Sequence, residues 1–176
     1  DQPRSRGLGD VYKRQEESII KSDSHIEGIS KDNLTYDIWK SLGLRDVSPR
    51  QLSPLVLAYI GDSIFDLVVK TMIVTKGNTQ VNKMNRMASS IVKAESQSKM
   101  IGYIEDKLSE EEKGVYKRGR NAKSYTSAKN ASISDYRRAT GFEALMGYLY
   151  MSGRYERMCE LIKDALDYLE SEKSDK

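Results

Sequence analysis

Two acidic side chains far apart in the sequence are the residues best suited to chemistry. Asp62 stands in the stretch 57–66 (LAYIGDSIFD) and Glu143 in 141–150 (GFEALMGYLY), where apolar and small residues surround each acid. A carboxylate within an apolar helical surface is costly unless it is paired or bound to a metal ion. Because small neighbours let two helices pack closely, the pair predicts a site in which carboxylate oxygens hold Mg²⁺.

The chemistry open to such a pair is attack of water on a phosphate ester. A bound Mg²⁺ can activate the water and neutralise the leaving oxygen. This requires no histidine, and the one histidine, His25, lies in a stretch without helical periodicity. The alternative is that an acid in a helix faces solvent or pairs with a lysine or arginine. Asp66, one turn after Asp62, is interpreted as such a structural or exposed acid.

A basic stretch lies between the two acids. Residues 113–138 contain eight lysines and arginines against a single acid, Asp135. A local basic patch suits a polyanion, and arginine forks suit phosphate oxygens. One or two of these cations could instead complement the dipole at a helix C-terminus, but that does not explain so many in 117–123. A merely solvated charged face is the other alternative. The side chains expected to contact nucleic acid are Lys117, Arg118, Arg120, Asn121, Lys123, Lys129 and Arg137.

The composition is typical of one globular domain with a sizeable core, since 31% of the 176 residues are charged and 38% hydrophobic. Cys159 is the only cysteine, so an intrachain disulfide is excluded. We expect this side chain to be a small core residue. The longest apolar run is interrupted by Asp62 and Asp66, so we expect no membrane span. A reducing cytoplasm fits these features.

The hydrophobic pattern predicts an all-α protein. We expect residues 1–30 to be a disordered or non-native tail and 31–176 to form one helical domain. Ser109 and Glu112 match a capping box at the start of a helix, and Ile38 and Trp39 are expected to face inward from a short one. The predicted helices are 34–42, 51–76, 79–106 (broken or continuous), 110–121, 134–151 and 154–170. The last of them is expected to bury Met158, Leu161, Ile162, Ala165 and Leu169.

Six short stretches occur in an order that a known family shares. They are 57–62 (LAYIGD), 110–112 (EEE), 118–124 (RGRNAKS), 129–130 (KN), 136–137 (YR) and 142–149 (FEALMGYL). As an ordered set they resemble the Mini-III ribonucleases. These are a reduced branch of the ribonuclease III class that lacks a double-stranded-RNA-binding domain.

The resemblance implies a single ribonuclease III-like helical domain that works as a homodimer and cleaves double-stranded RNA with Mg²⁺. By motif position, Asp62 corresponds to the metal-binding aspartate of the family and Glu143 to its metal-binding glutamate. Tyr59 takes the place of an aromatic residue at the dimer contact. The implied task is trimming the base-paired ends of precursor 23S ribosomal RNA in the cytoplasm. A ribosomal protein that presents this substrate is a candidate partner.

The sequence departs from the larger ribonuclease III enzymes at three positions. Those enzymes have glutamates where this chain has Leu55 and Ala58, and an aspartate where it has Thr140. The missing acids are consistent with the Mini-III branch and leave the number of metal ions per site open. Water can fill vacant ligand positions around Mg²⁺.

Two other functions compete with that of a magnesium-dependent endoribonuclease. One is a non-catalytic, ribosome-associated RNA-binding protein on the same fold. Asp62 and Glu143 argue against it, because a binding protein has no need to hold two desolvated acids. The other is a helical adaptor whose basic patch meets an acidic protein.

Overall fold

The computed structural model describes residues 34–45, 47–123 and 132–174. Within these residues it contains seven α-helices, two short 3₁₀-helices and no strand, which confirms the all-α class. His25 and Lys129 lie outside the described residues. The chain divides into two compact units, Asp1–Asp46 and Val47–Lys176.

The first unit contributes one described helix, α2 (Leu34–Leu42). It is followed by Gly43, whose φ of 58° lies in the left-handed region that glycine adopts readily. The expected inner face is only partly correct, because Trp39 is half-buried whereas Ile38 is exposed. Thr35, one turn before Trp39, is buried instead, so these two residues mark the inner side of the helix.

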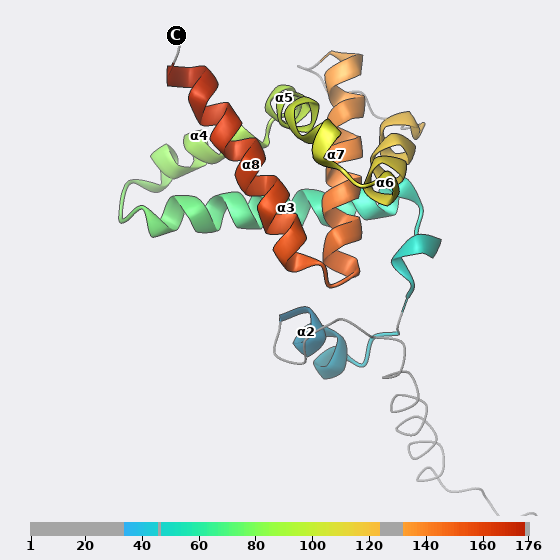
Figure 1. Cartoon of the computed structure of the whole chain (residues 1–176). Coiled ribbons are helices and arrows are strands. Elements are labelled where there is room, and N and C mark those ends of the chain that lie inside the picture. Colours follow the sequence, from blue (N-terminus) through green and yellow to red (C-terminus); the bar gives the residue numbers. More distant parts are fainter. Residues whose placement is uncertain (1–33, 46, 124–131, 175–176) are drawn as a thin grey trace, which may run out of the picture. The chain divides into compact units, whose positions relative to one another are not determined.

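The second unit is a bundle of six α-helices around α7 (Figure 1). Helices α3, α5, α6 and α8 all pack against α7. A helix that is buried on nearly all sides must be apolar or small on all sides, and α7 buries almost every residue from 139 to 149. The helices are α3 (Pro54–Thr75), α4 (Val81–Val92), α5 (Ala94–Ile104), α6 (Glu110–Asn121), α7 (Ile133–Met151) and α8 (Tyr155–Ser174), with 3₁₀ turns at Pro49–Gln51 and Glu105–Lys107.

The expected helix over 79–106 is broken rather than continuous. Lys93 adopts extended backbone angles and separates α4 from α5. The chain changes direction at Lys93, so that α4 packs on α3 while α5 packs on α7 and α8. The capping box is confirmed: the Ser109 hydroxyl accepts from the Glu112 amide, and the Glu112 carboxylate accepts from the Ser109 amide.

The last helix buries the face that the sequence predicted. Its five expected core residues, Met158, Leu161, Ile162, Ala165 and Leu169, are all at most 6% exposed. The expectation for Cys159 was wrong, because this side chain is exposed. It follows the buried Met158 directly, and one residue along a helix turns the side chain by about 100°, here toward solvent.

Candidate active site

The candidate site lies where α3 crosses α7, and two glycines make this crossing possible. A Cβ atom added to Gly61 would collide with the backbone carbonyl of Glu143. A Cβ added to Gly147 would collide with the backbone carbonyl of Leu57. Only residues without a Cβ let the two backbones come this close. The crossing therefore holds the backbone of Asp62, which follows Gly61, close to the turn of α7 that carries Glu143.

The two carboxylates at this crossing differ in exposure and repel each other. Asp62 is exposed and Glu143 is half-buried. Burial and, second, the negative charge of Asp62 raise the pKa of Glu143 from 4.5 to about 7, against a hydrogen bond from Gln97 that lowers it. Although Asp62 is exposed, desolvation by its neighbours and, second, the charge of Asp66 likewise raise its pKa. A cation between these acids would relieve the repulsion and favour both ionised forms.

Gln97 on α5 completes the inner side of the site. Its amide Nε2 donates to Glu143 Oε1 at 3.1 Å and to the carbonyl oxygen of Val92 at 2.8 Å. Its Oε1 is buried and has no hydrogen-bond partner within the part of the chain that the structure describes. The site thus contains the carboxylate oxygens of Asp62 and Glu143, which are the kind of ligand that a hard cation such as Mg²⁺ prefers.

The residues present fit a magnesium ion held by few protein ligands. Among the residues that the structure describes, no three His, Cys, Asp or Glu side chains form a metal-binding group. Thr140 does not replace the missing acid, since its hydroxyl donates to the carbonyl of Tyr136 at 3.0 Å within α7. Ala58 is buried and carries no ligand atom. Mg²⁺ tolerates such a site, because it commonly binds one or two carboxylates and keeps several waters.

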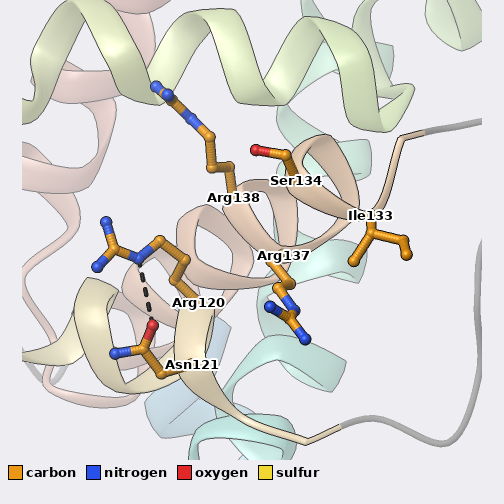
Figure 2. A pocket seen from close by; sticks show the side chains of 6 residues that line it. All are labelled: Arg120, Asn121, Ile133, Ser134, Arg137 and Arg138. Atoms are coloured by element: carbon orange, nitrogen blue, oxygen red, sulfur yellow. Dashed lines mark hydrogen bonds between the residues drawn. The ribbon is translucent and has the colours of Figure 1, made fainter.

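A basic hollow lies between the end of α6 and the start of α7. Figure 2 shows the residues that border it, Arg120 and Asn121 on α6 and Arg137 and Arg138 on α7. Its volume is about 500 Å³. The Arg120 guanidinium lies over the Tyr116 ring at 5.6 Å, and its Nε donates to Asn121 Oδ1 at 3.4 Å. Arginines around an open hollow suit the oxygens of a phosphate group.

The structure gathers some of the predicted nucleic-acid-binding residues in this hollow and leaves others outside it. Arg120, Asn121 and Arg137 line it, together with Arg138, Ser134 and Ile133. Lys117, Arg118 and Lys123 are exposed at the same end of α6 but do not line the hollow.

Gln97 and Arg138 were not among the candidate site residues taken from the sequence. For Gln97 a signal existed: it stands three and four residues before Met100 and Ile101, both fully buried, and so shares their apolar face. A glutamine on an apolar face needs a polar partner. For Arg138 the sequence offers only its place in the basic stretch. In the structure Arg138 points toward α5, where its guanidinium lies against Gly102 (Figure 2).

The outer face of α3 is unusually apolar for a helix in contact with solvent. Tyr59 is 81% exposed, and Leu55, Val56 and Leu67 on the same helix are exposed as well. This exposed apolar face does not make α3 a membrane helix. None of the described helices combines the length and the apolar character needed to cross a bilayer.

Comparison with known proteins identifies the family. Residues 55–154 match the ribonuclease III domain. The Mini-ribonuclease 3 of Clostridium tetani is 50% identical over 122 residues, which cover 69% of this chain and 81% of that protein. The Mini-ribonuclease 3 of Brevibacillus brevis is 45% identical over 124 residues, covering 70% and 92%.

A solved structure agrees in fold. The crystal structure of a Fusobacterium nucleatum protein superposes with a TM-score of 0.62 at 28% identity and covers 67% of this chain and 94% of that one. The domain match includes both α3 and α7, the helices whose crossing carries the two acids. The chain therefore belongs to the ribonuclease III family, and within it to the Mini-ribonuclease 3 endoribonucleases.

Proposed function

We propose that this endoribonuclease cleaves double-stranded RNA and that Asp62 and Glu143 hold the Mg²⁺ that its reaction requires. The observation that carries the proposal is the meeting of two mutually repelling carboxylates at a glycine-lined helix crossing. Such an arrangement is unfavourable in the absence of a cation. When bound there, Mg²⁺ supplies an activated water and stabilises the charge that develops on phosphate oxygens.

The two acids have different parts in this proposal. Asp62 is exposed, so it stands on the side from which a nucleic acid would approach. Glu143 is half-buried and hydrogen-bonded to Gln97, so its carboxylate is held in one orientation. One acid anchored in the domain and one open to solvent would hold an ion at the surface, within reach of an RNA backbone.

In this proposal the basic hollow binds the phosphate backbone of the RNA. Arg120 and Arg137 come from different helices and border the same space (Figure 2). Arginines that border one hollow can each donate to the oxygens of a phosphate group. Lys117, Arg118 and Lys123 extend the positive surface along the backbone, where contacts are independent of sequence.

We further propose that the enzyme is a homodimer formed through α3. Exposed Tyr59, Leu55 and Val56 form an apolar surface that a second copy could cover. A two-fold axis would place one Asp62–Glu143 site against each strand of the duplex.

The proposed cellular substrate is precursor 23S ribosomal RNA, whose paired ends offer a duplex. This proposal, the cytoplasmic location and a ribosomal protein as substrate-presenting partner rest on the resemblance to the Mini-III ribonucleases. A non-catalytic RNA-binding role is set aside, because the chain belongs to a family of endoribonucleases.

The test is cleavage of a long RNA duplex by purified protein with and without Mg²⁺, beside single-stranded RNA and a DNA duplex. Asp62→Asn and Glu143→Gln should each abolish cleavage and leave RNA binding nearly unchanged. Asp66→Asn is the matched control, because Asp66 lies one turn from Asp62 but pairs with Lys70 at 2.7 Å. If either first variant keeps wild-type turnover, or if the control is equally inactive, the assignment of the two acids is wrong.

A further inference from the structure

Gln97 is a buried polar side chain that the proposed reaction has not used. It lies in the first turn of α5 and is only 1% exposed. Burying an amide without full hydrogen bonding is unfavourable. A hydrophobic residue would be buried there at a lower cost in free energy, so the presence of an amide calls for an explanation.

One half of the amide is fully satisfied. Nε2 carries two hydrogens, and it makes two bonds, to the Val92 carbonyl at 2.8 Å and to Glu143 Oε1 at 3.1 Å. These partners also fix which way the amide points. Both are acceptors, so the opposite orientation would set Oε1 against two oxygens.

The other half of the amide is unsatisfied. Oε1 is buried and has no hydrogen-bond partner among the described residues, although a carbonyl oxygen can accept two bonds. Capping the last carbonyl of α4, that of Val92, explains only one of the contacts. It explains neither the bond to Glu143 nor the orphaned oxygen. Because Oε1 and Nε2 share one carbon atom, the orphaned oxygen lies close to the carboxylate of Glu143.

We propose that Gln97 is a positioning residue of the metal site. Its amide nitrogen orients the carboxylate of Glu143, and its Oε1 would accept a hydrogen bond from a water that accompanies the ion when the ion is bound. This inference rests on the proposed function, since it takes Asp62 and Glu143 as the metal ligands. Groups that orient ligands in this way commonly matter for metal affinity by about ten- to a hundredfold.

The experiment measures metal binding to the RNA-free protein. Titration calorimetry with Mn²⁺ and Mg²⁺, together with the metal-induced rise in Tm, compares wild type with Gln97→Met, which keeps the length of the side chain. We expect the affinity for the ion to fall by about ten- to a hundredfold. Ser96→Ala is the matched control, because Ser96 is also buried on α5 but donates to the Ser90 carbonyl at 2.8 Å. Its metal affinity should equal that of wild type.

The outcomes separate this inference from the proposed function. If Asp62→Asn binds the ion as tightly as wild type, the proposed metal site itself is wrong. If Asp62→Asn loses the ion while Gln97→Met binds it as wild type does, only the role of Gln97 is refuted. Equal losses in Gln97→Met and Ser96→Ala would also refute it, since they would indicate a general packing effect.

A second variant keeps the test decisive if Gln97→Met does not fold. Gln97→Glu retains an oxygen near the ion but replaces the donor beside Glu143 with another negative charge. The metal-free variant should be less stable than wild type, and the ion should raise its Tm by more. A metal-induced rise equal to or below that of wild type would overturn the inference.

Discussion

Replacing Glu112 with glutamine should weaken the anchor that ties the first turn of α6 to α8. The Glu112 side chain is fully buried. It accepts hydrogen bonds from the Ser109 amide at 2.9 Å, from Arg154 Nη2 at 2.9 Å, and from Arg157 Nε and Nη2 at 3.1 and 3.0 Å. Glutamine keeps the size, but it has one acceptor oxygen and sets an amide donor against arginine donors.

The expected cost follows from these bonds. Hydrogen bonds to a charged group contribute about 1.5–3 kcal/mol each, and the variant loses those on one oxygen. Arg154 and Arg157 are 36% and 26% exposed, so water replaces part of the loss. We therefore expect the free energy of unfolding to fall by about 3 kcal/mol, and Tm to fall by about 6–12 °C. Thermal unfolding followed by circular dichroism at pH 7 measures this.

The control for Glu112→Gln is Glu110→Gln in the same helical turn. The Glu110 side chain is 93% exposed and meets Lys113 at 3.2 Å. An exposed pair of this kind should contribute less than about 0.5 kcal/mol. If both variants unfold at the same temperature, the buried network does not stabilise the fold and the reasoning is refuted.

The same network makes stability depend on pH. Burial by itself would raise the pKa of Glu112, but hydrogen bonds from Arg157 and Ser109 and the arginine charges outweigh it and hold the pKa below 4.5. The group thus binds its proton less readily in the folded chain than in the unfolded one. Its stabilisation is complete above pH 4.5 and is lost as pH falls through the folded pKa. The difference in stability between wild type and Glu112→Gln should therefore shrink below pH 4.5, and a constant difference would contradict this.

Three further predictions concern the RNA-binding surface, the dimer and the helix crossing. Arg120→Ala with Arg137→Ala should weaken duplex binding and reduce the slope of log affinity against log salt by about one unit per lost phosphate contact; the exposed Arg86→Ala should change neither. Tyr59→Asp should halve the mass measured by light scattering without unfolding the chain, whereas Tyr59→Phe should not; a monomeric wild type would refute the interface. Gly61→Ala should lower the free energy of unfolding by about 1–3 kcal/mol through overpacking, opposite in sign to the gain that alanine gives in an open helix, and a stabilised variant would contradict the crossing.

Local signals in the sequence predicted most of the helices and their ends. Ser109 and Glu112 act within one turn, so their capping box was readable, and the geometry confirms it. The break at Lys93 was less certain from the pattern, because apolar residues continue on both sides of it. The exposure of Cys159 was predicted wrongly, since apolar and charged residues are mixed around it on α8 and the turn toward solvent depends on the exact phase of the helix.

The candidate site was only partly accessible from the sequence. Acids among small residues indicated close helix packing, and the structure brings Gly61 and Gly147 to the crossing beside Asp62 and Glu143. Gln97 was missed because its partner Glu143 lies 46 residues away. No local pattern connects an amide on one helix with a carboxylate on another; that contact depends on the packing of α5 against α7.

The position of α7 links binding and chemistry in the proposed mechanism. Arg137 and Glu143 stand on one helix, about 9 Å apart along its axis. A phosphate bound by Arg137 would therefore lie at a fixed distance along the α7 axis from Glu143. Arg120 belongs to α6, whose first turn is tied to α8 by the buried contacts of Glu112 with Arg157. Glu112→Gln should consequently weaken RNA binding more than it changes the metal affinity of the Asp62–Glu143 site, because it loosens α6 while leaving the α3–α7 crossing intact.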